Sequence, residues 1–287
     1  MQHSIPWRPN RPSPVPIGGY HEVVVPAALA GLAECAWVHA ISAQATDARC
    51  SSHLILPHSG VSLACLYRRD MDGRMHNPLL ALIGPIARPR RFPIEPGAEI
   101  AAVRLYPEHV LALLGTRASE HCDEVQDITP LLRKYANSML DALAATRNWR
   151  QACGLLEGLL IALHQETRIS AQQARQQQAV LALRNAPVRR PVAKAAAELG
   201  ISPRQLQRRV YAAIGMTPKV YSRGLRFNRA LVAADVATQP DWAAVAQATG
   251  YVDQAHLAHE FRELCACAPG SLMRERRLES SLYAPKP

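Results

Sequence analysis

The sequence of 287 residues lacks several features that define other classes of protein. It has no apolar run of about 18 residues, so no transmembrane helix is predicted. Its first 16 residues, MQHSIPWRPNRPSPVP, contain no apolar signal core, and no secretory signal is expected. The seven cysteines are scattered and odd in number, which favours reduced thiols over a disulfide framework. We therefore expect a cytoplasmic protein without a membrane partner.

Motifs of common catalytic sites are also missing. The sequence has no nucleophile-elbow motif around a serine, no glycine-rich phosphate loop and no suitably placed pair of carboxylates. The sequence therefore predicts a protein that is not an enzyme and uses no cofactor.

Acidic residues are scarce in one part of the chain only. Residues 1–169 contain 16 Lys and Arg against 15 Asp and Glu, whereas residues 170–287 contain 17 against 8. Almost all of the net charge of +10 thus lies in the second segment. A globular region this basic typically faces phosphate, on nucleic acid or on a membrane surface. The alternative is a basic surface that serves solubility.

The hydrophobic pattern of the first half changes from strand-like to helical. Short apolar or alternating runs, punctuated by glycine and proline, predict strands at 53–57, 61–68, 79–86 and 100–107. Helical periodicity then predicts helices at 107–115, 128–146 and 149–164. The last two helices carry broad apolar stripes, which predict either packing on the β-rich domain or a homodimer interface.

The second half is expected to be entirely helical. Its predicted helices are 173–184, 191–199, 203–214, 218–236, 241–249, 253–264 and 269–277. The glutamine-rich segment 166–178 is either a linker or the polar start of the next helix. We expect an α+β protein of two domains: a β-rich domain at 1–168 with a helical pair at about 128–164, a linker at 169–180, and an all-α domain at 173–287.

An internal repeat organises this helical domain. The segment VAKAAAELGISPRQLQRRVYAAIGMTP (192–218) aligns with AAVAQATGYVDQAHLAHEFRELCACAP (243–269). Gly200 matches Gly250 at an offset of 50, and Leu206 matches Leu257 at an offset of 51. Each copy is a helix, a turn and a second helix, which predicts two helix-turn-helix units at 192–215 and 241–264. The connecting helix would span about 28 Å, against about 34 Å between consecutive major grooves.

The second helix of each unit is the predicted recognition helix. In the first unit, a helical wheel buries Leu206 and Val210 and turns arginine, glutamine and tyrosine outward. Arginine matches guanine, glutamine matches adenine, and alanine can contact the thymine methyl group. The candidate DNA-binding residues are Arg204, Gln207, Arg208 and Tyr211 in the first helix and Gln254, Ala255, His256, Ala258 and His259 in the second. Of these, His256 is expected on a flank near the phosphates.

This helical domain resembles the AraC/XylS family of bacterial transcription regulators over about residues 173–278. The segment DWAAVAQATGYVDQAHLAHEFREL (241–264), the following APGSL (268–272) and the GMTP of the first unit (215–218) carry the resemblance. The second unit departs from it, with ACAP (266–269) where the family has Gly-x-Ser/Thr-Pro. The first half is similar to the cupin-like sensing domains of such regulators, through ILPHSGVSLACLYR, PGAEIAAVRLYPEHVLALLG and DITPLLRK.

The resemblance implies a sequence-specific regulator that binds double-stranded DNA under the control of an N-terminal sensing domain. Activation, with RNA polymerase as a partner, is the commoner outcome in the family, and a small-molecule effector is an expected ligand. The sequence identifies neither the effector nor the operator, and it does not show the sign of regulation.

Two cysteine-containing clusters leave an alternative open. Cys50, His53 and His58 could bind Zn or Fe, which would make the first half a metal-dependent cupin-type enzyme fused to a DNA-binding tail. The two histidines are five positions apart across a proline and lack a downstream acidic partner, so ordinary hydrogen-bonded histidines are favoured. Similarly, Cys265 and Cys267 are interpreted as packing residues rather than a ligand or redox pair.

Overall fold

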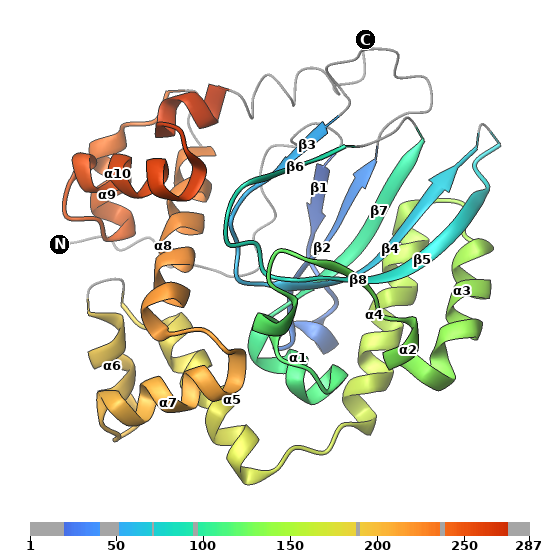
Figure 1. Cartoon of the computed structure of the whole chain (residues 1–287), viewed down its shortest axis with the longest axis horizontal. Helices are drawn as coiled ribbons and strands as arrows, with labels where there is room; N and C mark the ends of the chain where they lie inside the picture. Colours follow the sequence, from blue (N-terminus) through green and yellow to red (C-terminus); the bar gives the residue numbers. More distant parts are fainter. Residues whose placement is uncertain are drawn as a thin grey trace.

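The chain folds into an N-terminal region built on a β-sheet and an all-helical C-terminal region (Figure 1). The computed structural model describes residues 20–40, 52–70, 72–93, 97–187, 190–235 and 239–274. This arrangement confirms the predicted α+β organisation. Within these described ranges, no helix is both long and apolar enough to cross a bilayer.

A six-stranded antiparallel sheet, in the order β1-β2-β7-β4-β5-β8, forms the N-terminal region, with β3 and β6 paired separately. The strands are β1 (Tyr20–Val23), β2 (Ala33–Ala40), β3 (Ser52–Ile55), β4 (Val61–Arg69), β5 (Met75–Ile83), β6 (Arg90–Pro93), β7 (Ala98–Leu105) and β8 (Val125–Asp127). The sequence pattern did not predict β1, β2, β6 or β8. Strand β2 is buried at nearly every position, so it shows no alternation of polar and apolar residues.

The two faces of the sheet pack into different apolar cores, as alternate residues of β4 show. Leu63 and Cys65 belong to the main core, whereas Ala64 packs with Trp37 on the opposite side. The main core is closed by α3 (Ala136–Ala144) and α4 (Trp149–Glu166), which lie across the sheet (Figure 1). The helical pair therefore packs on its own sheet. The segment predicted as one helix at 128–146 begins instead with α2 (Thr129–Leu132) and a 3-10 turn at Arg133–Tyr135.

Short helices make up the described C-terminal region. They are α5 (Ala171–Asn185), α6 (Pro191–Glu198), α7 (Pro203–Ile214), α8 (Pro218–Asp235), α9 (Trp242–Thr249) and α10 (Gln254–Cys265), followed by helical residues at 269–274. The expected linker at 169–180 is wrong, because α5 already begins at Ala171. Ser170 accepts a hydrogen bond from the backbone N–H of Gln173, whose side chain accepts one from the N–H of Ser170. This capping box starts the helix, and only residues 167–170 connect the two regions.

The two regions are held together by a buried ion pair. Helix α1 (Pro107–Leu114) places the Glu108 carboxylate 2.9 Å from the Arg184 guanidinium of α5, with side-chain exposures of 1% and 6%. The Arg184 guanidinium also lies 3.4 Å from the centre of the Tyr106 ring. Burial raises the pKa of Glu108, and the charge of Arg184 opposes this shift. The desolvated pair is therefore sensitive to the loss of either partner.

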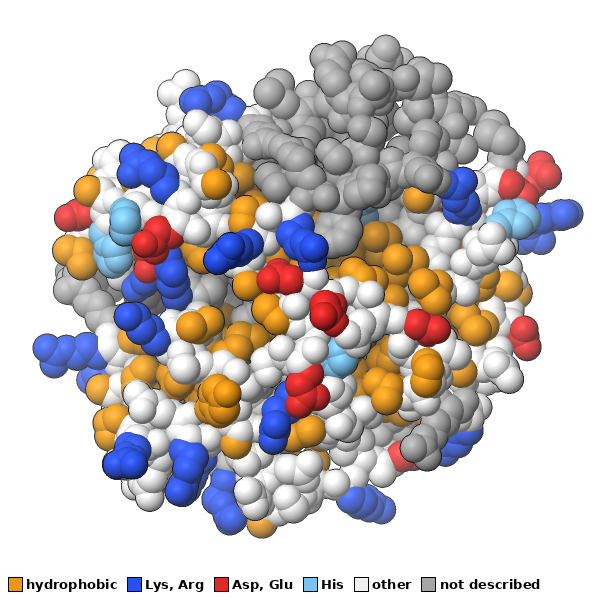
Figure 2. Space-filling model, in the orientation of Figure 1, with side chains coloured by type: hydrophobic (Ala, Val, Ile, Leu, Met, Phe, Trp, Pro, Cys, Tyr) orange, Lys and Arg blue, Asp and Glu red, His pale blue; other side chains and the backbone are white. Residues whose placement is uncertain are grey.

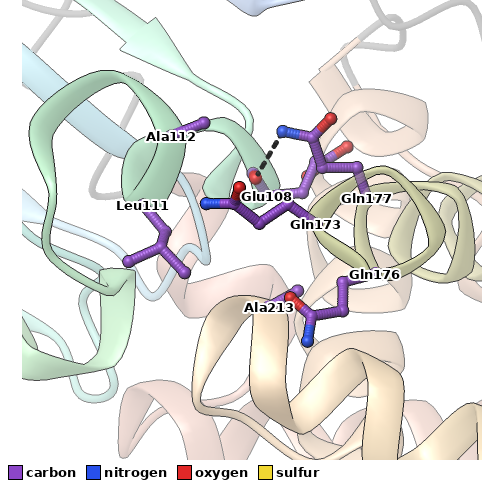
Figure 3. Close-up of a pocket in the computed structure, with 7 residues that line it drawn as sticks. All are labelled: Glu108, Leu111, Ala112, Gln173, Gln176, Gln177 and Ala213. Carbon is purple, nitrogen blue, oxygen red and sulfur yellow. Dashed lines mark hydrogen bonds between the residues drawn. The ribbon is translucent and has the colours of Figure 1, made fainter. Parts of the chain in front are cut away.

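Further contacts surround this ion pair and reach the end of α7. Figure 3 shows glutamine side chains of α5 beside α1, where the Gln177 amide donates a 3.4 Å hydrogen bond to the Glu108 carbonyl. At Gly215, which ends α7, a Cβ atom would lie 1.7 Å from the Ser119 hydroxyl oxygen of the N-terminal region. The next residue, Met216, packs against the cores of both regions. The N-terminal region thus contacts α7 at its C-terminal end.

The two units end their second helices with different residues in the same backbone conformation. Gly215 after α7 has φ +71°, and Ala266 after α10 has φ +56°, both in the left-handed region. A residue with a Cβ atom is disfavoured there by about 1–2 kcal/mol, whereas glycine is not. Ala266, in the segment ACAP, is therefore strained at the end of the second recognition helix.

The ion pair predicts an asymmetry between single and double substitutions. Glu108→Gln should weaken domain docking by about 3–5 kcal/mol, because it leaves Arg184 buried without its partner charge. Glu108→Leu combined with Arg184→Met should retain docking, because an apolar pair replaces the charges. Docking is measured by the rate of tryptic cleavage after Arg168, which is exposed in the connection between the regions. Equal cleavage of Glu108→Gln and an exposed control, Glu120→Gln, would show that the pair does not hold the regions together.

The strain at Ala266 predicts a stabilising substitution. Ala266→Gly should raise the local stability of α10 by about 0.5–1 kcal/mol, since relief of strain exceeds the entropy that glycine loses on folding. Ala258→Gly, in the middle of the same helix, should have the opposite effect of about 1 kcal/mol. Hydrogen exchange of the α10 amides in the full chain reports both changes. A loss of protection in Ala266→Gly would contradict the strain.

Candidate nucleic-acid interface

The two predicted recognition helices have the same length and the same place in the repeat. Helix α7 and helix α10 each contain 12 residues, and their bounds differ by the offset of 51 found in the sequence. Ser202 caps α7 by accepting from the N–H of Gln205, and Asp253 caps α10 by accepting from the N–H of His256. The predicted repeat and its two helix-turn-helix units are therefore confirmed at the level of structure.

Helix α7 presents a polar face that matches the helical wheel. Leu206 and Val210 are fully buried beneath it. All four candidate residues are exposed on the opposite side, namely Arg204, Gln207, Arg208 and Tyr211. Tyr211 is 59% exposed, which is unusual for a large aromatic residue and leaves both its ring and its hydroxyl accessible. This face offers hydrogen-bond donors suited to base edges and phosphates.

Helix α10 presents a face with fewer hydrogen-bonding groups. Gln254, Ala255 and His259 are exposed, and Ala258 is half-buried. The imidazole of His259, 67% exposed, lies 3.3 Å from the carboxylate of Glu263 on the same helix. The imidazole therefore lies beside an acidic group of its own helix.

His256 is engaged in the turn that precedes its own helix. Its Nδ1 atom accepts a 3.3 Å hydrogen bond from the backbone N–H of Val252, and its ring meets the ring of Tyr251 edge-on at 5.3 Å. The side chain is only 34% exposed. The sequence predicted a flank position near the phosphates, and the structure adds contacts that fix the turn.

The basic residues of the C-terminal region fall into two groups. Figure 2 shows Lys and Arg gathered over α6 and α7, whereas basic, acidic and histidine side chains mix over α10. Four other arginines are at least half-buried and bind acceptors inside the protein, namely Arg184, Arg223, Arg226 and Arg229. The net charge alone did not distinguish these groups. The recurrence of arginine every three residues along α8, with Glu260 and Glu263 on α10, was the available signal.

The described residues do not form the alternative metal site of Cys50, His53 and His58. Cys50 and the side chain of His53 lie outside them. The Nδ1 atom of His58 lies 3.1 Å from the Gly60 carbonyl, a hydrogen bond that orients the ring. Burial, reinforced by the charge of Arg104, lowers the pKa of His58 to about 3. Within the part of the chain that is described, no group of three metal-ligating side chains converges.

The cysteines of the second unit are packing residues. Cys265 is buried in the core that Leu257 and Phe261 form, and Cys267 lies partly buried against it. Burial raises the pKa of the Cys267 thiol, which disfavours the reactive thiolate.

Known proteins give two kinds of match. Residues 195–275 match the family model of a helix-turn-helix domain. The crystal structure of ToxT from Vibrio cholerae O395 is 8% identical, with a TM-score of 0.41 over 82% of this chain and 98% of that chain. Wild-type ToxT from Vibrio cholerae strain SCE256 with bound unsaturated fatty acid is 10% identical, with a TM-score of 0.39 over 78% and 93%. No curated protein sequence matches the chain.

The assignment rests on the family match together with the two capped units. The matched residues contain both recognition helices, the connecting helix α8 and the first-unit segment GMTP. Helix-turn-helix units of this type bind DNA. Residues 195–275, with their two capped units, therefore form a helix-turn-helix domain, a type of domain that binds DNA.

Proposed function

We propose that the protein is an AraC-type transcription regulator that reads two consecutive major grooves on one face of double-stranded DNA, using α7 and α10. The observation that supports this most directly is the equivalence of the two helices, with equal lengths, matching caps and outer faces exposed to solvent. Helix α8 joins them with 18 residues, about 27 Å of helix, which is comparable to the rise of about 34 Å per DNA turn. Because the two faces differ chemically, the bound site is asymmetric.

The two helices divide the work of recognition. The exposed arginines and glutamine of α7 provide the donors that discriminate bases. Ala255 and Ala258 of α10 offer only apolar contacts, and His259 already faces Glu263. In this proposal α7 selects the sequence, and α10 mainly positions the protein on the duplex.

The N-terminal region controls DNA binding through its contact with the first unit. Helix α1 contacts α5 through Glu108 and Arg184, Ser119 contacts Gly215 at the C-terminal end of α7, and the outer face of α7 stays exposed. The region therefore restrains the orientation of the first unit without covering its candidate DNA-binding face. We propose that a small-molecule effector acts by altering this contact, and that the regulator activates transcription with RNA polymerase in the cytoplasm.

Substitution of the α7 arginines tests base reading. Arg204→Ala or Arg208→Ala should weaken binding to the preferred site by about 1–3 kcal/mol and relax base choice in one half of it. Arg175→Ala removes an exposed charge from α5, outside the recognition helices, and should leave base choice unchanged. Dissociation constants for specific and random DNA are compared at fixed salt, since phosphate binding depends strongly on salt. An equal loss on both DNAs would make the arginine a phosphate contact.

A further inference from the structure

Helix α8 carries a row of arginines that binds the elements on either side of it. Arg229 donates a 2.8 Å hydrogen bond to the Arg184 carbonyl at the end of α5. Arg226 and Arg223 point to the other unit, where they pair with the carboxylates of Glu260 and Glu263 on α10. Figure 1 shows α8 running between the pair α6–α7 and the pair α9–α10. Helix α8 therefore contacts α5 on one side and α10 on the other.

The Glu260 carboxylate is the centre of the contact with α10. Although it is an acidic residue, Glu260 is only 7% exposed. Its Oε1 atom lies 2.5 Å from the Arg226 guanidinium and 3.4 Å from that of Arg223. The Arg226 guanidinium also lies 4.8 Å from the centre of the buried Tyr251 ring, in the turn before α10. A carboxylate held by two guanidinium groups is fixed in direction as well as in distance.

The ion pairs of Glu260 add to an apolar contact between α10 and α8. The apolar contact constrains the orientation of α10 less. Phe261, the residue after Glu260, packs on Phe227 of α8 with ring centres 4.9 Å apart, and both side chains are fully buried. Apolar burial holds α10 on α8 but is not directional. The equivalent position in the first unit is Arg209, at the repeat offset of 51. The carboxylate contact is thus specific to the second unit.

We propose that Glu260 is a positioning residue that sets the orientation of the second recognition helix on α8, and thereby the half-site spacing that the protein accepts. The proposal rests on the two-groove function proposed above. One inserted base pair moves a half-site by about 3.4 Å and rotates it by about 35° around the duplex. A rigidly held α10 does not follow this displacement, whereas a loosely held α10 does.

The test compares two DNA duplexes that differ by one base pair between the half-sites selected by the wild-type protein. We expect the full-length wild type to lose affinity by about tenfold or more on the insertion, which corresponds to 1.4 kcal/mol. In Glu260→Gln the loss of affinity on the insertion should fall to about threefold or less, because the neutral amide holds the guanidinium groups more weakly. Glu263→Gln provides a matched control, since this carboxylate is 50% exposed and its pairing is screened by solvent.

Two additional measurements separate positioning from unfolding. Footprinting shows whether the second half-site is still protected in Glu260→Gln, as the proposal requires. Arg226→Lys keeps the charge but loses the planar guanidinium. It should therefore reduce the loss of affinity on the insertion without loss of folded structure. If Glu260→Gln proves unfolded in its second unit, Arg226→Lys decides the question.

The outcomes distinguish the two proposals. A wild type that tolerates the insertion would overturn the two-groove function. A wild type that rejects the insertion, with Glu260→Gln and Arg226→Lys folded and equally strict, would overturn the positioning role of Glu260 alone. Relaxed spacing in both variants, with Glu263→Gln unchanged, supports the role.

Discussion

The attachment of both recognition helices to α8 is the constraint on which the DNA-binding region depends. Neither α7 nor α10, at 12 residues each, is long enough to be a stable helix alone. Each is fixed by buried apolar residues, and the second is also held through the Glu260 carboxylate and two arginines of α8. Contacts along α8 therefore constrain the orientation of one recognition helix relative to the other.

Contacts of Arg184 connect the N-terminal region to α8, the helix that holds both recognition helices. The Arg184 side chain pairs with Glu108 in the N-terminal region, and the Arg184 carbonyl accepts a hydrogen bond from Arg229 of α8. A change in α1 therefore reaches the connecting helix through one residue. The contact is desolvated and polar, so it contributes specificity of docking more than net stability. Such a contact suits regulation, because a modest change in its geometry alters its free energy substantially.

Local signals in the sequence predicted the helical repeat well and the contacts between elements poorly. The glycine turns and the apolar stripes are encoded within a few residues, so α7 and α10 were predicted almost to the residue. Strand β2 was missed because burial on both faces removes its alternation. The pairs Glu108–Arg184 and Glu260–Arg226 join separate elements, so the pattern within one element, such as the recurring arginines of α8, does not identify the partner on the other. Four arginines that belong inside the protein were consequently counted with the DNA-facing charge.

The most direct test of the account is selection of bound sequences from random DNA by the full-length protein. Two unequal recognition helices on one rigid connection predict a single asymmetric motif of two blocks, about one helical turn apart. The spacing should be fixed, and the block read by α7 should be the more informative. A single short block, or two blocks at variable spacing, would contradict the account.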